Sequence, residues 1–234
     1  MTIDRWIAVV GLLIALPGFF ELFLTGHQTE GTLAVLLGFV VVGFAWIIQY
    51  ILSLPSFSAK STEVKLELDM DKTGSVARIT KHHELRPNTE AQRLVIRHNG
   101  GRGGSKEFSW KGESGLIEKV EEIKVFADTV VTVLFAPPIP RWRPFKGALS
   151  YHLIDSFLEK REFFAHVVEF PAKTLTIKVV FPKERPCLEA TAARRVGANE
   201  KRLDDLKRLH EGELVELTLK RPAVGSEYWI RWNW

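Results

Sequence analysis

Residues 64–70 read VKLELDM, and every second residue in this stretch is apolar. Successive side chains of a strand point to opposite faces, so this alternation is typical of a β-strand with one buried face. Short segments rich in β-branched or aromatic residues recur to the end of the chain: 93–98, 106–110, 129–135, 163–170, 174–181, 213–219 and 227–234. Turn-forming sequences such as APPIP and FPKERP separate them. The pattern predicts one antiparallel all-β domain over 63–234, either a sandwich or a barrel.

Two further features refine this domain. Residues 199–212 (NEKRLDDLKRLHEG) combine spaced leucines with mixed charges and a final glycine, which predicts one short helix. In the last segment, Tyr228, Ile230 and Trp232 fall on one face of a strand. We expect these three side chains to pack in the core; a membrane-surface or ligand-stacking role for the aromatic residues is the alternative.

Before the first strand, the pattern is continuously apolar rather than alternating. Residues 6–24 contain one ionisable group, Glu21, and residues 31–54 contain none. A bilayer core needs about 20 apolar helical residues, so both segments are long enough to cross it. We therefore predict a transmembrane helical hairpin over 1–54, followed by a linker at 55–62. A cleaved signal peptide fits poorly, because the first five residues are barely basic and no cleavage pattern follows. A buried soluble hairpin is the other alternative.

Small residues on the two segments would let membrane helices approach closely. They are Gly11, Ala15 and Gly18 on the first segment, and Gly38 and Gly43 on the second. Glu21 is an intramembrane acid near the end of the first segment. Its carboxylate either faces a partner within the membrane or reaches the outer interface, and the second account is simpler.

The flanking charges predict the orientation of the hairpin. The connection at 25–30 has no Lys or Arg, whereas Arg5 precedes the first segment and Lys60 and Lys65 follow the second. The positive-inside rule therefore places both termini in the cytoplasm, which predicts a multi-pass protein of the bacterial inner membrane. The single cysteine, Cys187, cannot form an internal disulfide, which agrees with a reducing compartment.

The part of the chain after residue 54 carries most of the charge. The chain has 32 basic and 28 acidic residues, of which one basic and three acidic residues lie in 1–54. The rest of the chain therefore has 31 basic and 25 acidic residues, a net charge of +6. Such a surplus favours an anionic membrane surface or a phosphate-bearing ligand, although a plain solvated surface is the commonest explanation.

No catalytic motif stands out. The sequence has no G-x-S-x-G, Walker A, H-E-x-x-H or C-x-x-C pattern, and its seven histidines are scattered. In SYHLID (150–155), Ser150 and His152 would share a strand face while Asp155 points to the other, so they do not make a triad. We expect no enzymatic activity, no metal and no cofactor.

Two loops carry the candidate ligand-binding residues. Arg102 lies among four glycines in NGGRGGS (99–105), where backbone N–H groups can approach a phosphate; a flexible hairpin loop is the alternative. The proline-rich segment 137–146 presents Arg141, Trp142, Arg143 and Lys146. Guanidinium groups and an indole suit phosphate pairing and base stacking, and they equally suit an anchor at a membrane interface.

A two-helix membrane hairpin, a minimal turn and a β-rich cytosolic domain together resemble the two-transmembrane, β-strand-rich effectors of bacterial anti-phage CBASS signalling. The resemblance covers the whole chain as an architecture and no individual ligand residue. It implies that the β domain binds a cyclic di- or oligonucleotide and that assembled hairpins then disrupt the inner membrane. The implied partners are the lipid bilayer and further copies of the chain in a homo-oligomer, without DNA.

A second interpretation stays open. The β domain predicted here is longer than a minimal barrel, so a sandwich that binds a partner protein from the same operon is the alternative. In that case the hairpin is a constitutive anchor without killing activity.

Overall fold

The computed structural model describes residues 56–68, 75–99, 104–112, 117–125 and 128–234. Its regular structure is almost entirely β. The strands are β1 (Phe57–Leu68), β2 (Val76–Pro87), β3 (Ala91–Asn99), β4 (Ser105–Gly112), β5 (Ile117–Val125), β6 (Asp128–Ile139), β7 (Phe145–Ile154), β8 (Arg161–Val167), β9 (Ala172–Val180), β10 (Glu189–Val196), β11 (Asn199–Leu203), β12 (Leu206–Leu209), β13 (Leu214–Lys220) and β14 (Glu227–Asn233). A 3-10 turn, η2 (His210–Gly212), is the one helical element in these ranges. The all-β prediction is confirmed.

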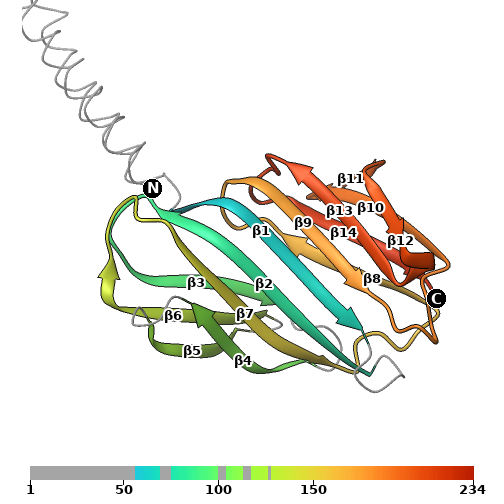
Figure 1. Ribbon diagram of the computed structural model, residues 1–234, viewed down its shortest axis with the longest axis horizontal. Coiled ribbons are helices and arrows are strands. Elements are labelled where there is room, and N and C mark those ends of the chain that lie inside the picture. Colours follow the sequence, from blue (N-terminus) through green and yellow to red (C-terminus); the bar gives the residue numbers. More distant parts are fainter. Residues whose placement is uncertain (1–55, 69–74, 100–103, 113–116, 126–127) are drawn as a thin grey trace, which may run out of the picture. The chain divides into compact units, whose positions relative to one another are not determined.

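The strands form three sheets (Figure 1). The large sheet has the order β12-β13-β9-β1-β2-β7-β4, and the smaller sheets have the orders β11-β10-β14-β8 and β3-β6-β5. None of the three closes on itself within the described residues. Most neighbours are antiparallel, as expected, but β1 and β9 run parallel from Ala59↔Ala172 to Glu67↔Val180.

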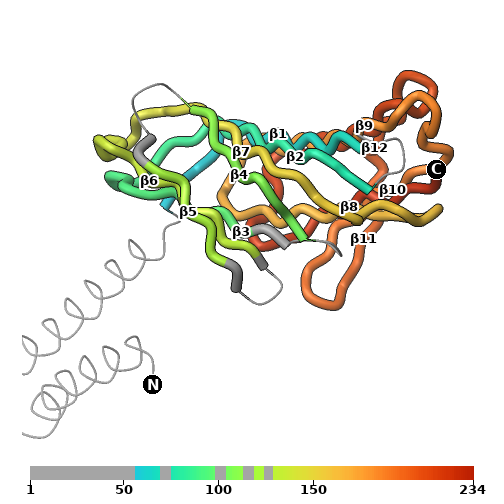
Figure 2. The backbone as a smooth tube through the Cα atoms, turned by 90° about the horizontal axis from the view of Figure 1, so that it is seen from below, coloured from blue at the N-terminus to red at the C-terminus, as the bar shows by residue number. Residues whose placement is uncertain are grey.

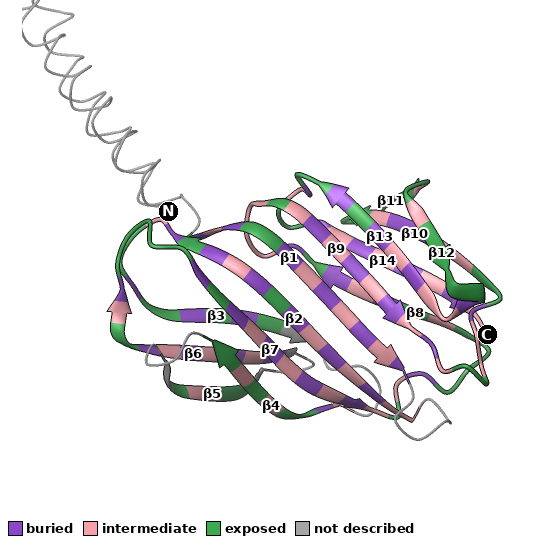
Figure 3. Ribbon diagram, in the orientation of Figure 1, coloured by how far each residue is buried: buried purple, intermediate pink, exposed green. Residues whose placement is uncertain are grey.

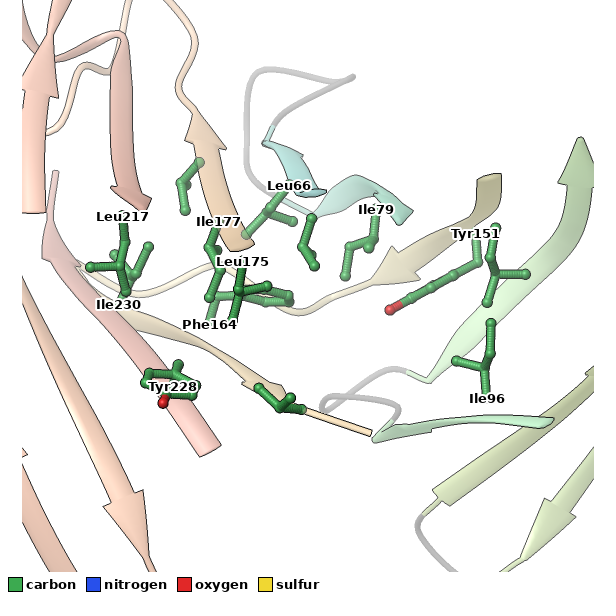
Figure 4. Close-up of a cluster of buried hydrophobic side chains, with 14 of the residues drawn as sticks. Leu66, Ile79, Ile96, Tyr151, Phe164, Leu175, Ile177, Leu217, Tyr228 and Ile230 are labelled. Atoms are coloured by element: carbon green, nitrogen blue, oxygen red, sulfur yellow. The ribbon is translucent and has the colours of Figure 1, made fainter. Parts of the chain in front are cut away.

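The large sheet forms one layer, and the two smaller sheets lie against its inner face (Figures 1 and 2). Strand β1 shows the reason: Val64, Leu66 and Leu68 are buried, while Lys65 and Glu67 alternate with them on the outer face. Buried residues alternate with intermediate or exposed ones along the neighbouring strands as well (Figure 3). Figure 4 shows side chains of the large sheet, such as Leu66 and Ile177, facing those of the smaller sheets.

The last strand completes the core, as the sequence predicts. Strand β14 lies between β10 and β8, and its residues Tyr228, Ile230 and Trp232 are all buried. Trp232 packs edge-on against Phe181 with ring centroids 5.6 Å apart. Burying large aromatic side chains is among the strongest apolar contributions to stability.

The helix predicted at 199–212 is wrong. This segment forms the two short strands β11 and β12 and the 3-10 turn. Strand β11 pairs with β10 and β12 pairs with β13, and Leu203 and Leu206 pack on the core at its margin. Ladder hydrogen bonds to these neighbours outweigh a weak local helical propensity.

The predicted linker is shorter than expected, because β1 already begins at Phe57, within 55–62. The predicted hairpin lies outside the described residues, together with Gly11, Ala15, Gly18, Glu21, Gly38 and Gly43. Among the residues that are described, no helix has the length and apolar character needed to span a bilayer.

Replacing Ile230 with Ala should destabilise the domain by about 2–5 kcal/mol, because this fully buried side chain leaves a cavity between the layers. Chemical unfolding of the full chain, followed by near-ultraviolet circular dichroism, measures the loss. Arg231→Ala is the matched control, since this side chain lies on the opposite face of β14 and pairs with the exposed Glu200. Equal losses for the two variants would contradict the assigned core.

Candidate ligand-binding surface

The outer face of the large sheet carries a groove of about 690 Å³. Four strands contribute to it: β1 with Glu63, β2 with His82 and Glu84, β7 with Lys146, and β4 with Lys111. Pairing between the strands brings these residues together, since His82 lies opposite Glu63 on one side and Ala148 on the other. Ala148 in turn lies opposite Lys111. The groove is therefore a product of sheet register rather than of one loop.

Charge is unevenly distributed over the groove. Glu63 pairs with Lys178 at 2.9 Å, and Glu84 pairs with Lys60 at 3.1 Å, so both carboxylates already have cationic partners. Lys111 and Lys146 form no ion pair within the described residues. An anionic ligand in the groove would thus meet two available ammonium groups and the imidazole of His82.

A glycine shapes the sheet beneath the groove. Gly147 lies opposite Gly112, and the indole of Trp110 packs on its inner side so closely that a Cβ there would overlap the ring. Any larger residue at 147 would displace Trp110. A glycine at 147 is therefore what allows Trp110 to pack against β7 beside Lys146.

The loop between β6 and β7 holds the other residues predicted from 137–146. The guanidinium of Arg141 lies over the ring of Trp142, 4.7 Å from its centroid. The backbone N–H of Trp142 donates to the carbonyl oxygen of Pro87 at 2.9 Å, which ties the loop to the end of β2. Arg143 is also exposed. The structure thus brings Arg141 and Trp142 together on the loop, whereas Lys146 lines the groove. Arg102 lies outside the described residues.

A second polar cluster is internal, and sequence reasoning missed it. Lys81 and His83 point inward from β2 and are 4% and 6% exposed. The Nδ1 atom of His83 lies 3.3 Å from the Thr62 hydroxyl, and Glu169 approaches from the segment after β8. His83 also borders a cavity of about 10 Å³, which is the size of one water molecule.

Burial controls the protonation of this cluster. It lowers the pKa of Lys81, and the nearby Glu169 carboxylate opposes that shift. Burial raises the pKa of Glu169, while the charge of Lys81 and the backbone N–H of Arg97 act in the opposite direction. Burial, helped by the charges of Lys81 and His82, lowers the pKa of His83 to about 3, so this imidazole is neutral in the folded protein at neutral pH.

No catalytic or metal-binding constellation appears in the described part of the chain. Ser150 and His152 do share the outer face of β7, but Ser150 donates to the Thr80 hydroxyl at 3.3 Å. His152 instead faces Glu107, with Nδ1 2.9 Å from the carboxylate. No group of three metal-ligating side chains occurs among the described residues.

Comparison with known proteins gives no family. No family model matches the chain, and no curated protein matches it. Similar solved structures include a putative protease from Parabacteroides distasonis, with a TM-score of 0.47, 11% identity, and coverage of 76% of this chain and 40% of that one. An M1 zinc metallopeptidase from Deinococcus radiodurans has a TM-score of 0.44 and 13% identity, covering 75% and 42%.

A two-domain M1 zinc metallopeptidase variant bound to L-tryptophan gives a TM-score of 0.44, 14% identity and the same coverage. This chain therefore spans about two fifths of the length of the structures it matches. At these scores the likeness carries no argument about activity.

The titration of His83 predicts a specific acid sensitivity. The ordinary pKa of a histidine is 6.5, whereas that of the folded His83 is about 3. Between these values the unfolded chain binds a proton that the folded chain rejects, so stability falls as the pH decreases from 6.5 towards 3. His83→Leu removes this contribution. The free energy of unfolding of the variant should therefore fall with a slope that is smaller than that of the wild type by about 1.4 kcal/mol per pH unit.

Denaturant unfolding at several pH values in this window measures the difference in slope. Thr62→Val is the matched control, since it removes the hydroxyl beside Nδ1 of His83 and leaves the titrating imidazole in place. If His83→Leu keeps the wild-type slope, the imidazole does not titrate as assigned.

Proposed function

We propose that this chain is a membrane-anchored effector of anti-phage defence. Its β domain senses a cyclic nucleotide or a partner protein on the cytoplasmic side of the inner membrane. Ligand binding brings copies of the chain together, and their hairpins then disrupt the bilayer. The layout of two apolar segments followed by a β-rich domain supports the proposal, and so does its resemblance to effectors with that layout.

The observation that carries the sensing role is the groove of the large sheet. Its volume of about 690 Å³ lies within the range of small-molecule sites, roughly 300–1,000 Å³. Lys111 and Lys146 offer charge-assisted hydrogen bonds to the phosphates of a cyclic dinucleotide. The carboxylates that would repel such a ligand, Glu63 and Glu84, are paired with lysines.

The killing role would follow from the hairpin. A single pair of apolar helices encloses no polar path, so it disrupts a bilayer only when many copies associate. The small residues Gly38 and Gly43 give the second segment positions at which another helix can approach closely. The alternative function is a constitutive anchor that holds a protein-binding β-sandwich at the membrane, and the two experiments below separate it from the effector.

The ligand test uses the double variant Lys111→Ala, Lys146→Ala. Each charge-assisted hydrogen bond contributes about 1.5–3 kcal/mol, so losing one should weaken binding of a cyclic dinucleotide roughly 10- to 100-fold, and losing both should weaken it further. Isothermal titration calorimetry of the full chain in detergent measures the affinity. Lys183→Ala, an exposed lysine outside the groove, should bind as the wild type does. Absence of cyclic-dinucleotide binding by the wild type would favour the partner-protein interpretation.

The killing test uses Gly38→Leu with Gly43→Leu. Leucine keeps the segment apolar but prevents close helix approach, so membrane insertion should persist while killing is lost. Entry of a membrane-impermeant dye into triggered cells is the readout, and extraction resistance at high pH reports insertion. Wild-type cells that stay impermeable although the protein is inserted and bound to its ligand would leave the constitutive anchor as the function.

A further inference from the structure

One end of the large sheet is distinct in charge from the other. The strand pairings define the two ends. The start of β1 lies beside the end of β2 and the start of β9; the end of β2 lies beside the start of β7, and the start of β9 lies beside the end of β13. We call this the proximal end and the opposite one the distal end. The proximal end comprises residues 56–60, 84–90, 140–146, 168–174 and 220–226, and the distal end comprises 66–68, 75–77, 153–162, 180–189 and 209–214.

The proximal end is strongly basic. It carries eight basic residues, namely Lys60, Arg86, Arg141, Arg143, Lys146, Lys173, Lys220 and Arg221. Its three acidic residues are Glu84, Glu90 and Glu169, of which Glu84 is paired with Lys60 and Glu169 is largely turned into the protein. The distal end has the opposite balance, with four basic and eight acidic residues. The two ends of the large sheet therefore differ in net charge, with +5 (8 − 3) at the proximal end and −4 (4 − 8) at the distal end.

Two turns at the proximal end also expose apolar side chains beside their arginines. Trp142 is 50% exposed in the β6–β7 turn, between Arg141 and Arg143. Val224 is 51% exposed in the β13–β14 turn, three residues after Arg221. Trp142 adopts a positive φ of 65°, and its backbone N–H donates to the carbonyl oxygen of Pro87, so the backbone of the turn that carries the indole is tied to the end of β2. Exposed tryptophan flanked by arginine is typical of segments at the headgroup level of a bilayer.

This end contains the start of the domain, which follows the predicted membrane segment closely in the sequence. The second apolar segment ends at Leu54, and the sheet begins at Phe57. Three residues span at most about 11 Å. The carbonyl oxygen of Ser56 accepts a hydrogen bond from the N–H of Asn88, so the start of the domain is tied to the same end that carries the basic turns.

We propose that the proximal end is a membrane-docking surface that binds anionic phospholipid headgroups through Arg141, Arg143 and Arg221, with Trp142 inserted at the interface. The inference rests on the membrane hairpin of the proposed function and does not need the nucleotide site. It assigns the β6–β7 turn to lipid phosphates and leaves the groove lined by Lys111 and Lys146 to a soluble ligand. Docking would hold the sensor in one orientation on the membrane.

The test places a polarity-sensitive fluorophore on the variant Trp142→Cys in the full chain, reconstituted in vesicles with and without phosphatidylglycerol. The natural thiol, Cys187, is 2% exposed, which favours labelling at the introduced site. Spin-labelled lipid headgroups then report proximity by quenching. Leu158→Cys is the matched control, since Leu158 is 51% exposed in the turn at the distal end.

We expect strong quenching at position 142 in anionic vesicles and none at position 158. Adding Arg141→Gln and Arg143→Gln, or raising the salt concentration, should reduce the quenching at 142, because screening shortens the reach of these charges from about 10 Å at 0.1 M salt to about 3 Å at 1 M. Equal quenching at 142 and 158 in inserted protein would overturn the docking surface. So would loss of the quenching at 142 on adding a soluble cyclic dinucleotide in excess, which would assign the turn to the soluble ligand.

Resistance to extraction at high pH is measured on the same samples, and it separates this inference from the proposed function. A chain that is extracted from the vesicles refutes the membrane anchor itself. A chain that resists extraction but shows no quenching at 142 refutes only the docking surface.

Discussion

The parallel pairing of β1 with β9 is the interaction on which the large sheet depends. On one side of it lie β1, β2, β7 and β4, and on the other lie β9, β13 and β12. Within the described residues, no other strand pairing joins these two groups in the sheet. Both smaller sheets need its inner face as a partner, so the two-layered core depends on this ladder. The ladder also aligns the basic β6–β7 and β13–β14 turns at one end of the sheet.

Local alternation revealed the strands whose inward positions are apolar, such as β1 and β14. It could not reveal β2 in the same way, because Lys81 and His83 occupy two of its inward positions. The same feature explains the missed internal cluster, since Glu169 lies far along the chain and reaches Lys81 only through the packing of the layers. At 199–212, leucines spaced as in a helix instead pack from two short strands, because neighbouring edges supply the hydrogen bonds.

Some residues of the candidate site could likewise be predicted from the sequence, and others could not. The composition of the proline-rich segment identified Lys146 and the Arg141–Trp142 pair without any knowledge of the fold. Lys111 was not identified from the sequence, because only the pairing of β4 with β7 brings it near Lys146. The register of that pairing includes an irregularity between Lys106 and Ser109. Register over such distances depends on the whole sheet, and no local pattern encodes it.

The place of β1 also has a mechanical consequence. Strand β1 is the first strand of the domain and is hydrogen-bonded on both sides, to β2 and to β9. A force applied at Phe57 along the axis of β1 would shear both ladders at once, so many hydrogen bonds would share the tension instead of opening one after another as at a peeled edge. A membrane anchor of the kind proposed for residues 1–54 would therefore load the domain through a strand that is held on both sides rather than through an edge strand.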